Sequence, residues 1–275
     1  MNELILNRND IGKYNTWVRA INEKMYRPYL TVRKVNKFGR RHWLWCDVQK
    51  REVHLLSDGE RRAYEIMVSD PRTVSVFEQY ALDITDTLAI AKQFGVVHPR
   101  NYKTSQLSVM TTDFLIVTQA VDKFGANTIK KTAYTFKYSS ELYSDSTCSA
   151  FLKSATRTIQ KLKIEQEYWK RRGIEYRIIT ELQMTKEWAW NINFCKIGIK
   201  QSVDQELAVK FSALFYNKWE QNRYINLSNL LKLSALAMRI DHFTAEQLFY
   251  FCVLNKLVNL VHSSCLQKHL PIELE

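Results

Sequence analysis

The chain has 275 residues, of which 46% are hydrophobic, and this is enough for one large domain or two of ordinary size. With only 7 Gly and 4 Pro, the composition excludes a disordered or low-complexity chain. The formal net charge of +12 favours a polyanionic partner, with nucleic acid preferred over an anionic membrane surface.

Cysteine usage and hydropathy indicate the compartment. The five cysteines are scattered with no C-x-x-C, which is typical of a reducing compartment and excludes a zinc ribbon or a disulfide framework. The N-terminus lacks the apolar core of a signal peptide, and no unbroken apolar stretch reaches the roughly 18 residues of a membrane span. We therefore expect a soluble, intracellular protein without a membrane partner.

The first sixty residues combine an arm with short strands. Residues 1–27 are predicted to form an N-terminal arm with a short helix over 15–24, and alternation predicts strands over 29–35, 42–46 and 53–56. Basic residues with interleaved Trp and Tyr favour a surface that follows a phosphate backbone, although solvated hairpin tips are an equal alternative. The basic residues are Arg33, Lys34, Lys37, Arg40, Arg41, Lys50 and Arg51.

A helix is predicted to begin at Ser57 and to run to about residue 68. Glu60 lies three residues after Ser57, which is the spacing of a capping box. In that role the Glu60 carboxylate accepts a hydrogen bond from a backbone N–H and does no chemistry. After the segments 74–78 and 80–84, a helix is predicted over 85–94, and Gly95 ends it.

Residues 108–142 are predicted to form an antiparallel hairpin. Two β-rich runs flank a loop in which Gly125 and Asn127 can take positive φ. If pairing starts at Asp122 with Thr128, Asp113 lies opposite Lys137, with the two side chains on one face. A cross-strand ion pair is one interpretation, and half of a metal-dependent phosphodiesterase site is the other.

The remainder of the chain changes from mixed to helical character. A long helix over 149–172 is followed by a strand over 174–180, and this crossover predicts an α/β fold with a central mixed sheet flanked by helices. Helical spacing then dominates over 204–219, 226–240 and 244–261, which predicts a separate helical or winged-helix-type unit. The expected domains are residues 1–27, 28–184 and 185–275.

Phosphodiester hydrolysis at neutral pH requires carboxylates that hold one or two divalent ions, and a nearby lysine can orient water or balance charge. Restriction-type nucleases carry an acid on one strand and acid-x-Lys on the next. Here the second element is Thr135-Phe136-Lys137, so the acid at 135 is missing. Thr135 can supply only a hydroxyl, the Phe136 carbonyl becomes a candidate metal ligand, and Glu60 is the candidate for a third carboxylate.

Six short motifs are similar in order and spacing to those of the TnsA endonucleases, the nuclease subunits of heteromeric cut-and-paste transposases. The resemblance covers roughly residues 28–195. The motifs are H-L-L-S-D-G-E over 54–60, G-V-V-H-P over 95–99, T-T-D-F-L over 111–115, F-K at 136–137, E-Q-E-Y-W over 165–169 and G-I-x-x-x-I-I-T-E over 173–181.

The resemblance implies a restriction-endonuclease-like domain followed by a winged-helix-type domain. It also implies that Glu60 and Asp113 are metal ligands, that Lys137 is catalytic, and that Glu165 supports the site. One or two Mg²⁺ or Mn²⁺ ions would be held by these carboxylates and by oxygens of Thr135 and Phe136. The family usually has Gln at position 135, where this chain has Thr.

The implied activity is hydrolysis of one phosphodiester at each 5′ end of the transposon. The implied partners are transposon-end DNA, a TnsB-type DDE transposase and a TnsC-type ATPase regulator that contacts the C-terminal domain. The implied location is the prokaryotic cytoplasm, with nucleoid association when the protein is active. A stand-alone restriction- or resolvase-like nuclease, or a basic DNA-binding scaffold with a dead site, remain the alternatives.

Overall fold

The computed structural model describes residues 8–35, 39–101, 105–121, 125–142 and 149–275. The chain divides into two compact units, the first formed by Met1–Arg61 with Arg72–Gln183 and the second by Arg62–Pro71 with Met184–Glu275. Across the described residues, no helix combines the length and apolar character that a membrane span requires. The functional domain boundaries predicted from the sequence stay a prediction.

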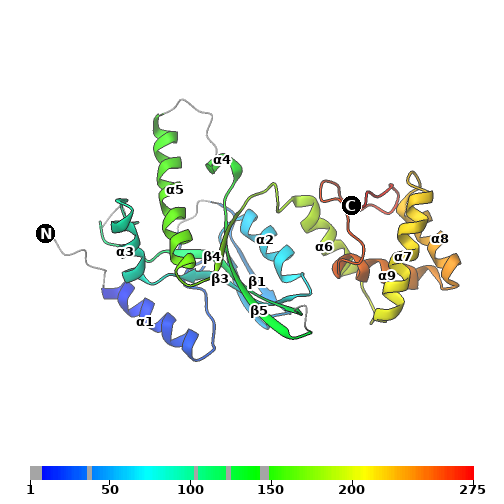
Figure 1. Ribbon diagram of the computed structural model, residues 1–275, viewed down its shortest axis with the longest axis horizontal. Helices are drawn as coiled ribbons and strands as arrows, with labels where there is room; N and C mark the ends of the chain where they lie inside the picture. Colours follow the sequence, from blue (N-terminus) through cyan, green and yellow to red (C-terminus); the bar gives the residue numbers. More distant parts are fainter. Residues whose placement is uncertain (1–7, 36–38, 102–104, 122–124, 143–148) are drawn as a thin grey trace. The chain divides into compact units, whose positions relative to one another are not determined.

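The first unit is built on a four-stranded sheet in the order β3-β4-β5-β6. The strand bounds are β3 (Thr73–Ala81), β4 (Thr111–Val121), β5 (Asn127–Phe136) and β6 (Glu175–Ile179). Strands β3, β4 and β5 are antiparallel, whereas β6 runs parallel to β5 because a helix carries the chain back between them. The predicted α/β class with a mixed sheet is confirmed, and Figure 1 shows the flanking helices.

Helices α3 (Ile84–Gln93) and α5 (Ser149–Lys170) pack together over the face that carries Leu115 and Ala133. The short α4 (Ser139–Leu142) precedes α5. Helix α2 (Asp58–Val68) begins against the Phe136 ring, and a Cβ on Gly59 would lie 2.0 Å from that ring. Glycine at 59 therefore permits the start of α2 to approach the end of β5 closely.

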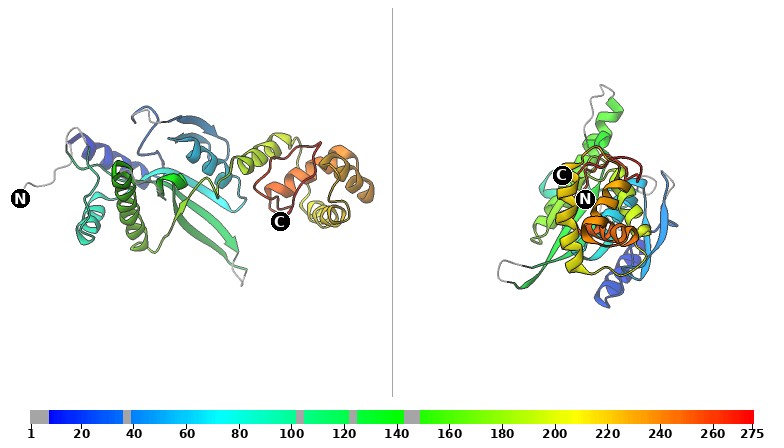
Figure 2. Two further views of the ribbon diagram at one scale, coloured as in Figure 1. Left: turned by 90° about the horizontal axis from the view of Figure 1, so that it is seen from above. Right: turned by 90° about the vertical axis from the view of Figure 1, so that its right-hand side faces the viewer.

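The predicted register of the β4–β5 hairpin is wrong by two residues. Phe114 pairs with Tyr134, and Val121 pairs with Asn127. Asn127 therefore belongs to the strand, and Gly125 takes the positive φ of 83° in the connection. A shift of two residues preserves the side-chain face, since strand side chains alternate with period two. Figure 2 shows the hairpin from above; residues 122–124 lie outside the described part of the chain.

The N-terminal part consists of α1 (Arg8–Asn22) and a two-stranded antiparallel ribbon of β1 (His42–Cys46) with β2 (Arg51–Leu55). The strand predicted over 29–35 is wrong, because the described residues there form bends and turns. The side chain of Tyr29 is buried among the rings of Tyr14 and Trp17, and its backbone N–H donates to the Gln79 carbonyl. This segment is therefore not a strand, and the Tyr29 backbone hydrogen bond attaches it to β3.

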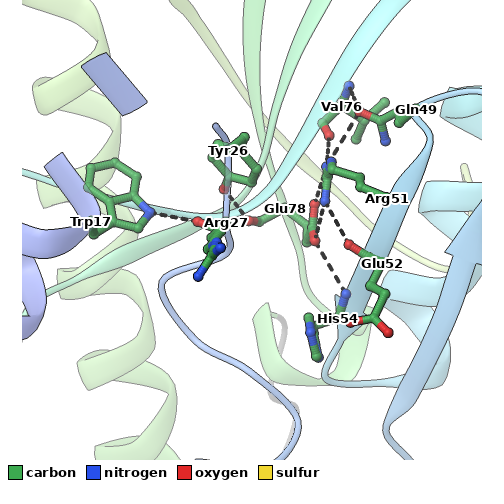
Figure 3. A network of polar contacts seen from close by, with 9 residues as sticks. All are labelled: Trp17, Tyr26, Arg27, Gln49, Arg51, Glu52, His54, Val76 and Glu78. Carbon is green, nitrogen blue, oxygen red and sulfur yellow. Dashed lines mark hydrogen bonds and ion pairs between the residues drawn. The ribbon is translucent and has the colours of Figure 1, made fainter. Parts of the chain in front are cut away.

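A buried ion pair joins the β1–β2 ribbon to β3 (Figure 3). Arg51 donates to both carboxylate oxygens of Glu78, at 2.8 and 2.6 Å, and also to the Val76 carbonyl at 2.6 Å. Since the Glu78 side chain is fully buried, the bidentate guanidinium supplies the compensating charge. Arg51 is therefore an internal structural residue and does not belong to the basic surface predicted from the sequence.

The second unit is mainly helical, as predicted. Its helices are α6 (Lys186–Gly198), α7 (Gln205–Gln221), α8 (Leu227–Met238) and α9 (His242–Leu254). Phe211, Phe215 and Phe249 lie at the centre of an apolar core. Within its described residues, the β pairing of this unit is an isolated bridge between Leu260 and Leu274, so the wing of a winged helix stays a prediction.

Candidate functional site

Four of the predicted site residues converge at one end of the central sheet. Glu60 lies in the first turn of α2, Asp113 is the third residue of β4, Lys137 follows β5, and Glu165 lies on α5. Electrostatic interactions connect Asp113 with Glu60, Glu165 and Lys137. Residues that are distant in sequence therefore form one charged cluster; their roles stay predictions.

Glu60 forms the predicted helix cap and also faces the cluster. Its N–H donates to Ser57 Oγ at 3.0 Å, and its Oε2 accepts from the Leu56 N–H at 2.9 Å. Burial, followed by the neighbouring charge of Asp113, raises the pKa of Glu60 to about 8. The capping and chemical interpretations are therefore compatible, because the cap fixes the position of a carboxyl group whose ionised form is disfavoured by burial and by Asp113.

Asp113 accepts a hydrogen bond where the β4–β5 ladder ends. Its Oδ2 accepts from the Phe136 N–H at 2.9 Å, and the Gln79 side chain also hydrogen-bonds to it. Burial raises the pKa of Asp113, while Lys137 and these hydrogen bonds act in the opposite direction. The hydrogen bonds from Phe136 and Gln79 therefore hold the Asp113 carboxylate in place.

Glu165 is held by hydroxyl groups from the sheet. Its Oε2 accepts from Thr135 at 2.7 Å, from Tyr176 at 3.2 Å and from Thr112 at 3.3 Å. Burial and the charge of Asp113 raise the pKa of Glu165 to about 7. Thr135, which was predicted to be a metal ligand, therefore directs its proton to Glu165 and is 2% exposed.

Lys137 supplies positive charge to the cluster. Its Nζ donates to the Phe136 carbonyl at 3.0 Å. Burial alone lowers the pKa of Lys137, but Asp113 and the other surrounding carboxylates raise it above the ordinary value. The lysine is thus charged at neutral pH, and the Phe136 carbonyl, predicted to be a metal ligand, already faces a cation.

The donor chemistry of the cluster suits a hard divalent cation. Carboxylate and carbonyl oxygens are the ligands preferred by Mg²⁺ and Mn²⁺, and raised carboxyl pKa values indicate negative charge that a further cation would stabilise. Among the described residues, no three His, Cys, Asp or Glu side chains are grouped closely enough to hold a metal by themselves. Backbone oxygen such as that of Phe136 would have to complete the ligand set.

Sequence reasoning missed two further residues near these carboxylates. Gln79, 1% exposed, donates to Glu60 Oε2 at 3.1 Å. Glu141 on α4 interacts electrostatically with both Asp113 and Lys137. No motif in the sequence marks Gln79, and nothing in the sequence brings Glu141 to the site.

The predicted basic surface is divided by the structure. Arg33 is exposed and stacks its guanidinium 4.4 Å from the centroid of the Trp43 ring, while Lys34 and Arg40 are exposed. Arg41 instead donates to the Val32 and Val35 carbonyls and fixes its own loop. Lys37 lies outside the described residues. A DNA-binding role for the exposed members stays a prediction.

The mixed sheet with a carboxylate and lysine cluster at its end is consistent with a nuclease fold, and comparison with known proteins agrees. Residues 70–181 match the family described as TnsA-like endonuclease N terminal. The chain is also 27% identical over 218 residues to the Escherichia coli "Transposon Tn7 transposition protein TnsA", covering 79% of this chain and 72% of that protein. The chain is therefore similar to the TnsA endonucleases, most clearly over residues 70–181.

Proposed function

We propose that the chain is the metal-dependent DNA endonuclease subunit of a heteromeric transposase, and that it hydrolyses a phosphodiester at each 5′ end of the transposon. The observation that carries the proposal is the buried cluster of Glu60, Asp113 and Glu165 around Lys137. Asp113, Lys137 and Glu165 lie within the TnsA-like endonuclease region of residues 70–181, and Glu60 precedes it. Structural ion pairs rarely gather three carboxyl groups with raised pKa values, whereas catalytic sites commonly do.

In this proposal Asp113, Glu60 and the Phe136 carbonyl hold Mg²⁺ or Mn²⁺, one ion or two. When bound, the ion supplies charge stabilisation at the phosphate and activates water. Lys137 balances the negative charge that develops on the phosphate oxygens and orients the attacking water. Glu165 holds the Thr135 hydroxyl at 2.7 Å and fixes the end of β5 that carries Lys137.

The proposed partners are inferred from the similarity to TnsA. They are transposon-end DNA, a TnsB-type DDE transposase that cuts the 3′ strands, and a TnsC-type ATPase regulator that contacts residues 185–275. The exposed Arg33, Lys34 and Arg40 would contact phosphates near the cut, which is consistent with the net charge of +12. The proposed domains are an N-terminal arm over 1–27, a restriction-endonuclease-like domain over 28–184 and a winged-helix-type domain over 185–275. The proposed location is the prokaryotic cytoplasm.

Strand-specific cleavage tests this proposal. End-labelled transposon-end DNA is incubated with the chain and Mg²⁺ or Mn²⁺, with and without the cognate DDE transposase. We expect 5′-strand cleavage only in the complete mixture. Asp113→Ala and Lys137→Ala should each lower the rate at least about a hundredfold, the scale expected when one electrostatic stabiliser is removed, with DNA affinity nearly unchanged.

The alternatives give different results. Efficient cutting by the chain alone would support a stand-alone nuclease. Full cleavage by both variants would show that the site is assigned wrongly. A wild-type chain that binds DNA but neither cuts it nor binds Mn²⁺ would favour the scaffold, in which the Phe136 N–H, Gln79 and Lys137 satisfy Asp113 without a metal.

A further inference from the structure

Gln79 has a backbone conformation that is unusual for its position. It lies inside β3, yet its φ is +51°, in the left-handed region that non-glycine residues rarely adopt. Its neighbours Glu78 and Tyr80 pair with Phe114 and Thr112 of β4, whereas Gln79 itself has no partner in that register. The strand therefore carries a local irregularity at the position that faces Asp113.

The surrounding structure fixes this conformation from several sides. The Gln79 carbonyl accepts from the Tyr29 N–H at 3.1 Å, and the Tyr26 hydroxyl donates to the adjacent Glu78 carbonyl. The Arg51 guanidinium donates hydrogen bonds to both carboxylate oxygens of Glu78, as Figure 3 shows. An unfavourable backbone persists only when neighbours determine it this strongly, and such residues concentrate at functional sites.

The conformation directs the Gln79 amide between two carboxylates. Nε2 donates to Glu60 Oε2 at 3.1 Å, and the side chain also hydrogen-bonds to Asp113. The Thr111 hydroxyl donates to Gln79 Oε1 at 3.3 Å, and this contact orients the amide so that its two N–H groups face the acids. One neutral side chain thus links the start of α2 to the start of β4.

We propose that Gln79 is a positioning residue that sets the separation and orientation of Glu60 and Asp113 for cation binding. This inference rests on the proposed metal-dependent function. A glutamine serves this purpose because it donates two hydrogen bonds without adding charge to an already acidic cluster. Residues that hold metal ligands in place contribute to metal affinity although they do not touch the ion.

The test uses the full chain, Mn²⁺ as the probe, and calorimetry together with thermal unfolding in EDTA. Gln79→Met keeps the side-chain length but removes the donors, and Gln79→Gly removes the side chain while suiting a positive φ. Gln119→Met, at an exposed position of β4, is the matched control. We expect both Gln79 variants to weaken Mn²⁺ affinity by about 10- to 100-fold, with the control unchanged.

The glycine variant separates positioning from a merely structural role. If Gln79 only shapes the strand, Gln79→Gly folds as well as the wild type and binds Mn²⁺ equally, and this result would overturn the inference. Retained thermal stability with weakened Mn²⁺ affinity is the result that supports it. A wild-type chain that does not bind Mn²⁺ would overturn the proposed function itself, and unchanged affinity in both Gln79 variants would overturn this inference alone.

Discussion

The two units bury different kinds of side chain. In the second unit the buried core is built mainly from apolar residues such as Phe211, Phe215 and Phe249, and its helices begin at ordinary capping residues. In the first unit, one end of the sheet buries Glu60 and Glu165 with raised pKa values. Apolar packing accounts for most of the core of the second unit, but it offers no reason for the acidic cluster.

This difference separates residues whose burial stabilises the fold from residues whose burial is unfavourable for it. Burying a carboxylate without full neutralisation destabilises a fold, and a replacement by a neutral residue is often tolerated or stabilising. The acidic cluster persists together with an unfavourable backbone at Gln79. Unfavourable features gathered at one place are expected at functional sites, where activity takes precedence over stability.

The largest expected effect concerns the apolar core. Phe215→Ala in the second unit should lower the free energy of unfolding by about 3–5 kcal/mol, because a fully buried ring is lost and a cavity remains. Chemical denaturation followed by circular dichroism measures this change. Phe243→Ala is the control, since Phe243 is 49% exposed and should cost far less. Equal losses in the two variants would contradict the packing assignment.

The acidic cluster should make stability depend on pH in the opposite direction from ordinary salt-bridged carboxylates. The folded-state pKa values of Glu60 and Glu165, about 8 and 7, exceed the ordinary value of 4.5. Between pH 4.5 and 8 the folded state therefore binds more protons than the unfolded state, so stability is lost as pH rises through this window. The effect should be on the order of a few kcal/mol in EDTA.

Thermal unfolding of the metal-free chain, measured from about pH 5 to about pH 9, tests this dependence. This range brackets the raised pKa values of Glu60 and Glu165. Glu60→Gln should flatten the curve because the amide does not titrate. Added Mn²⁺ should restore stability most at the alkaline end, where the carboxylates are ionised and ready to bind it. An identical pH slope in the wild type and Glu60→Gln would contradict the assigned burial of charge.

The smallest effect concerns a helix cap in the second unit. The Asp204 side chain accepts from the Leu207 N–H at 2.7 Å at the start of α7. Asp204→Ala should lower the free energy of unfolding by about 1 kcal/mol and leave Mn²⁺ affinity unchanged. Denaturation and calorimetry on one preparation check both points. A loss of Mn²⁺ affinity in this variant would contradict the claim that metal binding depends on the first unit alone.

The sequence predicted most of the fold because periodicity and local signals were strong. The helices over 85–94 and 149–172 and the end of the first of these at Gly95 were all predicted from such signals. The strand over 29–35 was wrong, since alternation cannot reveal that Tyr29 anchors to β3. The hairpin register was wrong because it depends on the detailed conformation of the connection.

The candidate site was predicted less completely. Asp113 and Lys137 stand out because each is a charge within an apolar β-rich run, and Glu60 needed the family resemblance to be more than a cap. The contact from Thr135 to Glu165 depends on how α5 crosses the sheet, which local patterns do not encode. Gln79 was missed because its role depends on a single backbone angle.

Metal binding by Asp113 tests the central claim most directly. Mn²⁺ is titrated at about pH 7.5, near the pKa values of the acidic cluster, into the wild-type chain and into Asp113→Asn, which keeps the shape of the side chain. We predict heat of binding for the wild type and an affinity at least about a hundredfold weaker for the variant, with both chains equally folded. Equal affinity in the two chains, or no binding by the wild type, would contradict the assignment of this cluster as the metal site.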